Sequence, residues 1–540
     1  MKTIYIGISL LLLNWNVANA QEFLESVQPL SAKSQKGYMY NVSAESNGGN
    51  SITFKAKVDK KSDVISFEKY VFDKNLKFLN ASEVSENKEV KADIERTSFY
   101  AYVGGTSSFD VLSMKLKINK RVQLKKWNYE KQRYVTKKTL SDESIKPKND
   151  NGNVYFGYAS FVASNDSKNN VFAIAKIDSK DKKVADQFVV LGIDEQLELK
   201  EEKIKLDGSY SLVFCSQIEG DDVVMVFAPN KNQSDVSKYV YLRYNLQGIL
   251  KKKIEFKSPA SAMLITAVQD KDDAVYFFGM STKSSKAYEE VFKEYAPIYN
   301  PGAANGSNKL DLKWRKSLEE DMDFFHLLKF SADQLEFASS TSVSDFKAKF
   351  KTAAGDKGAS PYKGKNFFIE NFSVTSNGEF LVAGQIASTV KMGLENTVDS
   401  YEDIICFHFD KTGNLKAQYG IGKMNNDKKS EIFSMYQNFY ASPDGKSVYW
   451  ELLEIKGFKG YESFLDAYVG NTTFYPMYFP RIVQIDLETN TLGSIKVLGD
   501  GKYYLKRDFK SLFNEDENSV TYFGSDKDFE QLWIAKMLIK

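Results

Sequence analysis

One pattern recurs along this chain and constrains its fold more than any other feature. A turn of Asn, Asp or Gly is followed by a run of β-branched and aromatic residues that often ends in Gly or Ala. The seven copies begin at Ser46, Asn149, Glu219, Asp270, Ser376, Pro443 and Glu517. Such turn residues accept tight or left-handed conformations, and such runs favour a pleated surface. The repeat therefore predicts an all-β chain built from hairpins.

A second hairpin follows several of these copies. It begins at Tyr239 in Y-V-Y-L-R-Y-N-L-Q-G-I-L-K, at Asp403 in D-I-I-C-F-H-F-D-K-T-G-N-L-K and at Arg481 in R-I-V-Q-I-D-L-E-T-N-T-L-G. Two hairpins supply four antiparallel strands, which make one blade of a β-propeller. The repeat predicts about seven four-stranded blades with loop insertions. Strand-like runs between Ser98 and Leu140 allow an eighth blade, and a β-sandwich or a multidomain β array is the alternative architecture.

The two ends of the chain complement each other. The last repeat unit ends at Leu532–Leu538 with only its third strand. A propeller closes its ring by taking the missing outer strand from the other end of the chain, and this protects the first and last sheet edges. We expect Phe23–Leu30 to supply that strand.

One copy of the repeat resembles a known family. The stretch Y-A-S-P-D-G-K-S-V-Y-W at Tyr440–Trp450 is similar to the S-P-D-G-K turn of TolB-like propeller repeats, and T-S-N-G-E-F-L-V-A-G at Thr375–Gly384 is a weaker relative. In those repeats the motif forms the inner hairpin of a blade. The resemblance therefore implies a propeller fold and a structural role for the motif, and it implies no particular activity.

Residues 1–20 have the composition of a secretory signal peptide. Lys2 supplies the positive region, Ile4–Leu13 form a short apolar core, and Ala18-Asn19-Ala20 matches a cleavage site. Gln21 stands where a lipoprotein would carry cysteine. We therefore expect a cleaved, exported protein of the periplasm, associated with the outer membrane. No later window reaches eighteen apolar residues, so we expect no direct membrane span.

Charge and composition exclude several kinds of function. The formal net charge of +2, from 73 basic and 71 acidic residues, argues against nucleic-acid binding, which usually needs a large, clustered basic excess. With only two histidines, His326 and His408, we expect no metal site and no cofactor. Cys215 and Cys406 lie in apolar runs and are predicted to be buried thiols, with a single disulfide between them as the alternative.

Familiar catalytic motifs are incomplete in this sequence. Gly445-Lys446-Ser447 lacks the upstream glycine of a phosphate-binding loop. Strand alternation places Cys406, His408 and Asp410 on one face, but neighbours on a strand face lie about 7 Å apart, beyond hydrogen-bond reach. Asp410 also opens a D-K-T-G-N turn, where Asp commonly binds its own backbone. We therefore predict no catalytic residue, with carboxylates converging at the central channel of a hydrolytic propeller as the alternative.

Residues 21–540 are expected to form a single propeller domain that three insertions interrupt. The insertion near 283–310 predicts a short helix broken by Pro297 and then a Gly/Asn loop. The insertion near 346–367 is rich in Lys, Gly and Ala and predicts a mobile loop. The insertion near 457–480 is rich in aromatic residues. Departures from a regular repeat are candidate contact surfaces, because loops carry function on rigid folds.

The aromatic insertion is the leading candidate for partner binding. Its aromatic residues are Phe458, Tyr461, Phe464, Tyr468, Phe474, Tyr475, Tyr478 and Phe479. Such residues supply large contact areas and are enriched at protein interfaces. The alternatives are that the segment folds back onto the propeller rim or that it contacts a membrane. We predict a protein partner in an outer-membrane or envelope complex.

The segment from Val111 to Leu140 is strongly basic. It holds ten Lys or Arg residues against one acidic residue, Glu130. Such a segment could meet anionic lipid, polysaccharide or an acidic partner. The alternative, which we favour, is an outer strand whose lysines prevent aggregation through its edge.

These features together predict an exported, non-enzymatic β-propeller that acts as a protein-interaction subunit of a bacterial cell-envelope complex. In overall character the chain resembles exported propeller-like proteins of bacteria with a type IX secretion system. That resemblance implies a role such as plugging the translocon pore from the periplasm. A carbohydrate-active or other hydrolytic propeller and a glycan-binding or sensor module are the alternatives.

Overall fold

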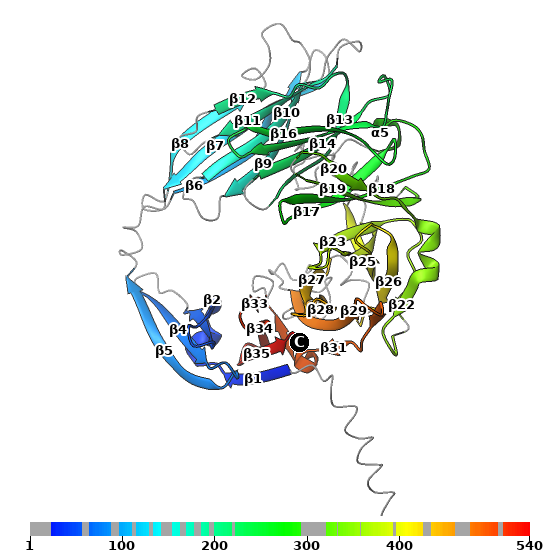
Figure 1. The fold of residues 1–540 in the computed structure, drawn as a ribbon. Helices are drawn as coiled ribbons and strands as arrows, with labels where there is room; N and C mark the ends of the chain where they lie inside the picture. The colour runs from blue at the N-terminus through cyan, green and yellow to red at the C-terminus, as the bar shows by residue number, and fades with distance from the viewer. Residues whose placement is uncertain are drawn as a thin grey trace, which may run out of the picture.

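Nearly every element of the computed structural model is a β-strand (Figure 1). The described residues are 23–56, 64–87, 97–110, 115–128, 133–141, 154–162, 169–177, 185–193, 199–218, 222–292, 320–331, 333–356, 358–392, 396–424, 434–458, 476–505 and 511–540. For strands β6 to β9 the backbone and the pairing alone are described. Among the described residues, no helix is long and apolar enough to span a membrane.

The first three sheets are antiparallel meanders, in which consecutive strands pair. The first sheet contains β2 (Tyr38–Ala44), β3 (Asn50–Lys55), β4 (Val64–Phe72) and β5 (Phe78–Asn87). The second sheet contains β6 (Thr97–Asp110), β7 (Lys115–Asn128) and β8 (Arg133–Ser141). The third sheet contains β9 (Val154–Val162), β10 (Asn169–Ile177), β11 (Gln187–Ile193) and β12 (Leu199–Lys203).

The next three sheets are also built on four-stranded meanders. The fourth sheet contains β13 (Tyr210–Gln217), β14 (Asp222–Pro229), β15 (Lys238–Asn245) and β16 (Leu250–Lys257). The fifth sheet contains β17 (Met263–Lys271), β18 (Ala274–Ser281), β19 (Phe324–Phe330), β20 (Leu335–Ala338) and the short β21 (Thr341–Ser342). The sixth sheet contains β22 (Phe350–Thr352), β23 (Phe367–Val374), β24 (Phe380–Met392), β25 (Asn396–Phe409) and β26 (Leu415–Ile421).

The seventh sheet has ten strands and joins two meanders through β32. The first meander contains β27 (Tyr436–Ala441), β28 (Ser447–Phe458), β29 (Pro476–Asp486), β30 (Thr491–Leu492) and β31 (Lys496–Val497). The last meander contains β32 (Tyr503–Leu505), β33 (Leu512–Asn514), β34 (Ser519–Asp526), β35 (Gln531–Leu538) and β1 (Phe23–Pro29). Short helices lie between the strands: α2 (Ala32–Gln35), α5 (Tyr288–Val291), η3 (Val343–Asp345), η4 (Lys347–Lys349) and η6 (Gly499–Gly501).

Strand β1 joins the two ends of the chain. It pairs antiparallel with β35, with Phe23 opposite Met537 and Pro29 opposite Gln531. The prediction that the N-terminal strand completes the last unit is therefore confirmed. Since β35 would otherwise end this sheet with unpaired backbone groups, β1 protects its edge.

The repeat observed in the sequence marks the hairpins of the sheets. Five of its seven turns lie within the described residues, and each connects two paired strands of a meander, as the turn before β18 does. For the copies at Asn149 and Glu219 the turns lie outside the described residues, and the apolar runs form β9 and β14. The second hairpins predicted from Tyr239, Asp403 and Arg481 are confirmed as the pairs β15–β16, β25–β26 and β29–β30.

Both faces of an inner strand are buried, and this explains its continuous apolar sequence. All eight residues of β14, D-V-V-M-V-F-A-P, are buried. Alternate side chains point to opposite faces of a strand. Val224 and Val226 accordingly pack in a cluster with the fifth sheet, whereas Val223 and Met225 pack with the third. The fourth sheet therefore separates two hydrophobic clusters.

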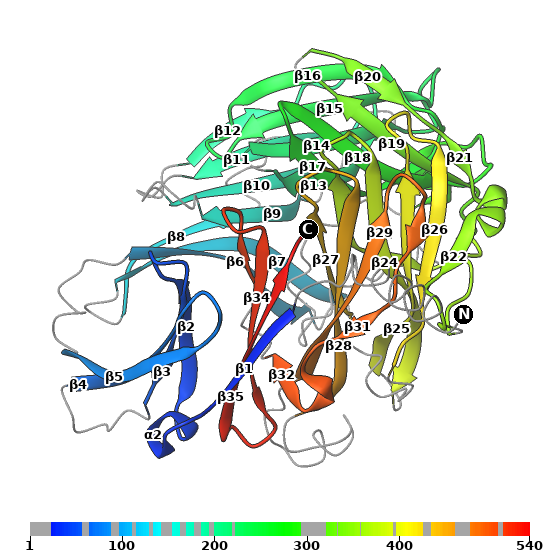
Figure 2. The ribbon, with the colours of Figure 1, turned by 60° about the horizontal axis from the view of Figure 1, so that its bottom comes forward.

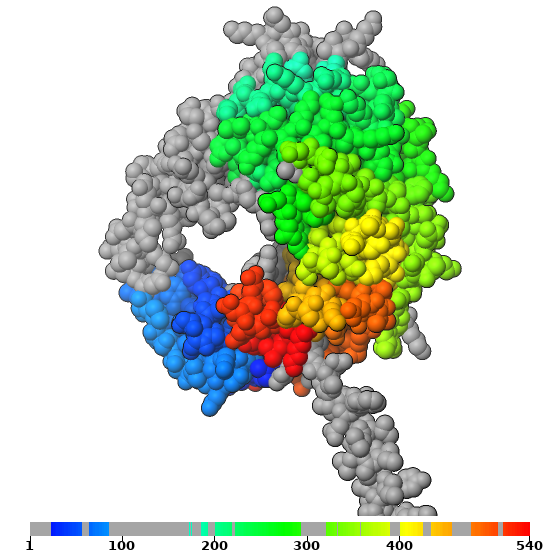
Figure 3. Space-filling model, in the orientation of Figure 1, coloured from blue at the N-terminus to red at the C-terminus, as the bar shows by residue number. Residues whose placement is uncertain are grey.

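The clusters link the sheets in sequence around a ring (Figures 1 and 2). They join the third sheet to the fourth, the fourth through the fifth to the sixth, the sixth to the first meander of the seventh, and that meander to the last one. A further cluster places Leu532 and Ile534 of β35 against Ile52 and Phe54 of β3. Figure 3 shows the same contact as the red C-terminal surface beside the blue first sheet. Packing of successive meanders around a ring is the construction of a β-propeller, so the predicted fold is confirmed at this level.

The described residues form seven hydrogen-bonded sheets, of which the largest contains two meanders. The segment from 98 to 140, where the sequence allowed an additional unit, forms the second sheet. Strand β8, with three of the ten basic residues of the segment from 111 to 140, lies at the edge of that sheet. Six others lie on β7, the central strand, so the interpretation of the segment as an edge strand holds for β8 alone.

In four of the described sheets the first strand of the meander carries a β-bulge, which inserts one extra residue into its pairing with the second strand. The extra residues are Tyr40 in β2, Val213 in β13, Thr266 in β17 and Glu370 in β23. A bulge breaks the alternation of side chains along a strand and redirects the extra residue. Polar side chains can therefore reach positions on inner strands that regular pleating would give to apolar ones.

The insertion near 346–367 differs from the mobile loop that its composition predicted. Phe346 and Tyr362 are buried, at 0% and 4% exposure, in the cluster between the fifth and sixth sheets. Strand β22 pairs in parallel with β26, so that Phe350 lies opposite Gln418. Two large aromatic side chains anchor this Lys- and Gly-rich segment, because their burial outweighs the flexibility of the residues around them. In the insertion near 283–310, the predicted short helix is α5, which ends before Pro297.

Candidate functional site

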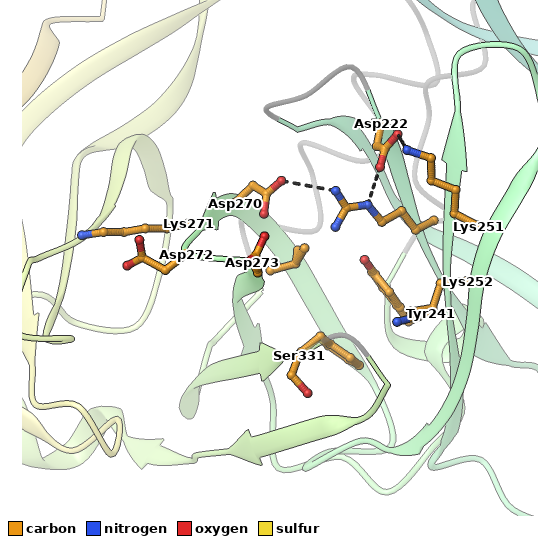
Figure 4. A pocket seen from close by; sticks show the side chains of 12 residues that line it. Asp222, Tyr241, Lys251, Lys252, Asp270, Lys271, Asp272, Asp273 and Ser331 are labelled. Atoms are coloured by element: carbon orange, nitrogen blue, oxygen red, sulfur yellow. Dashed lines mark hydrogen bonds and ion pairs between the residues drawn. The ribbon is translucent and has the colours of Figure 1, made fainter.

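A charged cavity lies between the fourth and fifth sheets (Figure 4). Its volume is about 720 Å³, and it opens among the turns that connect the first strand to the second and the third to the fourth. It is lined by Asp222, Tyr241, Arg243, Lys251, Lys252, Asp270, Lys271, Asp272, Asp273, Val275, Phe330 and Ser331. The cavity therefore combines apolar residues of the core with charged residues of the rim.

Two aromatic side chains support the cavity from below. The rings of Tyr241 and Phe330 are stacked at 4.7 Å between centroids, with an angle of 18° between their planes. Both residues are 1% exposed and belong to the cluster that joins the fourth and fifth sheets. Burial holds the pKa of Tyr241 well above its usual range, so its hydroxyl stays protonated. The floor is therefore rigid and uncharged.

A buried carboxylate organises one wall of the cavity. Asp222, at the start of β14, is only 2% exposed. Its carboxylate accepts a hydrogen bond of 2.6 Å from Arg243 Nε and a second of 2.6 Å from Lys251 Nζ. Arg243 also forms an ion pair of 3.5 Å with Asp270 on the opposite wall. A buried carboxylate needs such partners, because desolvation of an unpaired charge is costly.

The outer walls carry charges of both signs. Lys252 forms an ion pair of 3.1 Å with Asp333, which lies outside the cavity. Lys271 Nζ donates hydrogen bonds of 2.7 and 3.0 Å to the carbonyl oxygens of Val374 and Thr375 in the sixth sheet. Figure 4 shows Lys251 and Lys252 on the side opposite Asp270 and Asp272. The cavity can therefore receive charged groups through ion pairs on either wall.

The turn between β17 and β18 projects two carboxylates at the cavity mouth. Asp272 and Asp273 have φ angles of 51° and 61° and are exposed. Left-handed values at both central residues are typical of a hairpin turn, and Asp tolerates them better than most residues. Neither carboxylate forms an ion pair within the described part of the chain.

Both histidines are buried and form hydrogen-bond contacts within the sheets. His326 is 1% exposed, and its ring nitrogens lie 2.7 Å from Ser281 Oγ and 3.0 Å from Ser340 Oγ. Burial lowers the pKa of His326 to about 4, so the ring is neutral at pH 7. These contacts connect β18 and β19 to the segment that follows β20, and they leave His326 no access to solvent.

His408 is part of a second buried network. Its Nε2 lies 2.8 Å from Glu379 Oε2, and its Nδ1 lies 3.3 Å from the hydroxyl of Tyr419. Lys416 Nζ donates to the other oxygen of Glu379 at 2.7 Å. Burial lowers the pKa of His408, and the hydrogen bond to Glu379 opposes that effect. The imidazole therefore serves to join neighbouring strands of the sixth sheet.

The structure does not bring Cys406, His408 and Asp410 together as a catalytic set. Asp410 accepts hydrogen bonds of 2.9 Å from the backbone amides of Thr412 and Asn414, as its place at the start of a turn predicted. Cys406 is 0% exposed, and burial raises the pKa of its thiol well above the usual value. A thiol that stays protonated and inaccessible is a poor nucleophile.

Both cysteines are free and buried, as predicted. Cys215 lies among apolar residues between the third and fourth sheets, and burial raises the pKa of its thiol to about 12. Cys406 lies in the separate cluster between the sixth and seventh sheets. The alternative of a disulfide between them is therefore wrong.

The predicted partner-binding aromatics divide into two groups. Tyr478 and Phe479 are 3% and 2% exposed on β29, where Tyr478 packs against Tyr436 with 5.8 Å between ring centroids. These two side chains belong to the protein's own core. Phe458 ends β28, but its side chain lies outside the described residues, as do Tyr461, Phe464, Tyr468, Phe474 and Tyr475. For those six residues partner binding stays a prediction.

Several buried acidic residues were missed by the sequence analysis. Glu454 and Arg481 form an ion pair of 2.6 Å, with side chains 0% and 4% exposed. Glu451 is 0% exposed, and burial raises its pKa. Glu370 has one carboxylate oxygen without a hydrogen-bond partner, and burial raises its pKa to about 7. The signal was present as a charged residue inside an apolar strand, as in V-Y-W-E-L-L-E-I around Glu451 and Glu454.

Comparison with known proteins adds no family. No family model and no curated protein matches the chain. The β-propeller domain of the Trilobed protease from Pyrococcus furiosus is 10% identical, with a TM-score of 0.26 over 82% of this chain and 92% of that one. A mutant apocarotenoid oxygenase of Synechocystis is 9% identical, with a TM-score of 0.28 over 89% and 93%. A mutant levansucrase of B. megaterium is 9% identical, with a TM-score of 0.24 over 65% and 84%. Likenesses at these TM-scores carry no argument about function.

Proposed function

We propose that this chain is a non-enzymatic protein-interaction subunit of a bacterial cell-envelope complex. The observation that carries the proposal is that the histidine and cysteine side chains form structural contacts inside the protein. Both histidines and both cysteines are buried in contacts within or between sheets, whereas the open cavity displays preformed ion pairs on a rigid aromatic floor. A rigid ring with charged surface features suits recognition of another protein, because fixed charges steer association and specify register.

Within that proposal, the assembly is one that the exported chain meets in the periplasm at the outer membrane. The signal-peptide composition of residues 1–20 supports export. The character of the whole chain resembles exported propellers of bacteria with type IX secretion, and a plug of the translocon pore is the specific role that this resemblance favours. A ring of packed sheets is mechanically suited to obstruct an opening, because close-packed side chains resist deformation.

A native pull-down tests the proposal. The full chain carries a C-terminal tag, the envelope is extracted in mild detergent, and co-purifying proteins are quantified. We expect an outer-membrane partner in stoichiometric amount. Recovery of the chain alone as a monomer contradicts the proposal.

Charge-reversal variants test whether the charged cavity is part of the interface with the partner. We expect the pair Lys251→Glu and Lys252→Glu, or the pair Asp272→Lys and Asp273→Lys, to lower partner recovery about tenfold. Lys257→Glu is the matched control, because Lys257 is an exposed lysine on β16 that does not line the cavity. Equal recovery for all three proteins removes the cavity from the interface and leaves the pull-down result to judge the subunit role.

A hydrolytic propeller is the second candidate, and Glu370 is the observation that favours it. A carboxyl with a pKa of about 7 on an inner strand can act as a general acid near neutral pH. The test is a screen of glycan and ester substrates with the full chain and with Glu370→Gln. Turnover that Glu370→Gln abolishes supports hydrolysis, and absence of turnover in both proteins contradicts it.

A further inference from the structure

No strand among the described residues pairs with the outer edge of the first sheet. Strand β5 pairs with β4 on one side and ends the sheet on the other. It is ten residues long, and its residues from Leu79 to Ser85 are all exposed. Figure 1 shows β5 on the outer side of this sheet. A long edge strand presents unpaired amide and carbonyl groups to any segment able to pair with it.

Other outer strands in the described part of the chain are protected. Strand β26 is covered by β22, and β35 is covered by β1. Strand β16 carries four lysines in eight residues, and β12 is L-K-E-E-K. Strand β20 has only four residues. Covering, lysines and shortness are the devices by which proteins block pairing through an edge.

Strand β5 is neither short nor rich in lysine, and no described strand covers it, although it carries Glu83 and Glu86 and has Leu79 as an extra residue in its pairing with β4. Its sequence, F-L-N-A-S-E-V-S-E-N, contains no Lys, Arg or Pro. Polar residues in it are mostly small hydroxyl or amide side chains, which do not obstruct a neighbouring backbone. Since the other outer strands are protected, an open β5 is a specific feature of the first sheet and not a general property of the fold.

Exposed apolar side chains gather on the same sheet. The described residues include eleven exposed large hydrophobic side chains, and five of them belong to the first sheet. These five are Tyr38, Tyr40, Val64, Leu79 and Val84. Concentration of exposed apolar groups on one element is typical of an interaction surface.

Two tyrosines of β2 contribute to this surface. Tyr38 and Tyr40 are two positions apart and therefore lie on the same face of the strand, with 6.5 Å between ring centroids, and the Tyr40 ring lies 5.2 Å from that of Phe67. Lys55 Nζ lies 5.9 and 5.8 Å from the two tyrosine rings. The rings are thus held in place, which lowers the entropy lost when they are covered.

We propose that the edge of β5 receives an extended segment of a partner protein as an added strand. The inference rests on the proposed function, because it names the surface through which an interaction subunit would bind. The chain itself uses the same contact twice, where β22 adds to β26 and β1 adds to β35. Main-chain hydrogen bonds supply affinity in such pairing, and alternate side chains supply specificity.

The surface also defines the chemistry of the partner segment. It has about five to eight residues, the usual length of a strand. It alternates apolar and polar side chains, so that the apolar ones reach Leu79 and Val84 while the polar ones face solvent. It contains no proline at the positions that pair, because proline cannot donate to the ladder.

A peptide probe tests the edge without the partner. The probe is a ten-residue peptide of alternating Thr and Val with Lys at both ends, and its control has Pro in place of three Val residues. Hydrogen exchange of the full chain is measured with each peptide at millimolar concentration. We expect exchange at residues 78–87 to slow about tenfold with the first peptide and to stay unchanged with the control. Unchanged exchange with both, or equal slowing with both, overturns strand addition at β5.

Substitutions test the edge in the natural complex. We expect Leu79→Lys and Val84→Lys together to weaken partner recovery in the envelope pull-down about tenfold, because lysines on an edge oppose pairing. Leu250→Lys is the matched control, since Leu250 is 37% exposed on the outer strand β16. The melting temperatures of the variants show whether each remains folded. Equal recovery of the partner by both variants overturns the proposal.

The outcomes separate this inference from the proposed function. Absence of any partner in the pull-down contradicts the interaction role, while the peptide probe still decides whether β5 accepts a strand. A partner that leaves exchange at residues 78–87 unchanged overturns β5 as its site and preserves the interaction role. Protection of β5 that rises with protein concentration in the isolated chain identifies a second copy as the occupant and overturns a partner protein.

Discussion

The carboxylates of Asp222 and Glu370 differ in how many hydrogen-bond and ion-pair partners they have. Asp222 is buried and accepts hydrogen bonds from Arg243 and Lys251, whereas Glu370 is half-buried and its buried Oε1 has no hydrogen-bond partner. Burial raises the pKa of Glu370 and so favours its neutral form. Substitution therefore tests the ion pairs of Asp222, and a change of pH tests Glu370.

Asp222→Asn is expected to destabilise the protein. The amide leaves Arg243 and Lys251 without their carboxylate in a partly desolvated site, so we expect a loss of about 3 kcal/mol in the free energy of unfolding. Urea denaturation at pH 7 measures it. The matched control is Asp333→Asn, because the Asp333 side chain is 93% exposed beside Lys252 and should cost less than about 0.5 kcal/mol. Equal stabilities of the two variants would show that the buried pairs contribute nothing.

Glu370→Gln is expected to change how stability depends on pH. The pKa of Glu370 is raised by burial from 4.5 to about 7. As pH rises through this window the unfolded chain releases the proton first, so the folded state loses stability, on the order of 2 kcal/mol. The glutamine side chain of the variant cannot ionise, and the variant should therefore be less sensitive than wild type between pH 5 and 8 and more stable at pH 8.

Denaturation at several pH values measures this effect, and Glu530→Gln, at an exposed residue, is its control. Parallel stability curves for wild type and Glu370→Gln would place the pKa of Glu370 near that of an ordinary glutamate.

Hairpins are the elements that could be predicted, because their signals are local. The Asp410 turn and the Ser46 turn are each contained within a few residues, and pairing of the flanking strands follows from them. The bulges at Thr266 and Glu370 could not be predicted, because a register shift depends on how two strands and the neighbouring sheet pack together. The pairing of Asp222 with Arg243 was missed for the same reason, since it joins strands 21 positions apart.

Deletion of β1 tests how much the strand that joins the two ends of the chain contributes to the stability of the protein. Phe23–Pro29 form seven cross-strand pairs with β35. At about 0.2 to 1 kcal/mol a pair, their removal should cost about 3 kcal/mol and expose the edge of β35. Calorimetry should show a lower melting temperature, and light scattering should show self-association. Val27→Thr is a mild control, because Val27 is 40% exposed. An unchanged melting temperature after the deletion would mean that β1 does not contribute to closure.

In the whole molecule, the N-terminal and C-terminal strands lie side by side because β1 pairs with β35. The pairing of the N-terminal strand with the last unit could be predicted from the sequence, because the last repeat visibly lacks a strand. The contents of each sheet interface could not, because side chains such as Phe346 and Tyr362 come from an insertion and not from the repeat. Which residues fill an interface depends on packing, and packing is not encoded in any local pattern.

Coupling between the two ends of the ring follows from the cluster that joins them. Leu532, at 0% exposure, packs against Ile52 and Phe54 of the first sheet although it stands near the C-terminus. Leu532→Ala should leave a cavity there, at a cost of about 3 kcal/mol. Hydrogen exchange should then quicken in β3, which lies almost the whole chain away in sequence.

Leu212→Ala is the matched control for this coupling, because Leu212 is equally buried but lies between the third and fourth sheets. It should destabilise to a similar degree and quicken exchange first in β10 and β14. If both variants quicken exchange equally in every sheet, the ring unfolds only as a whole. If Leu532→Ala leaves β3 unchanged, the first and last sheets do not stabilise each other. A selective effect on β3 would mean that the propeller is held closed at the junction of its two ends by side-chain packing in addition to the pairing of β1 with β35.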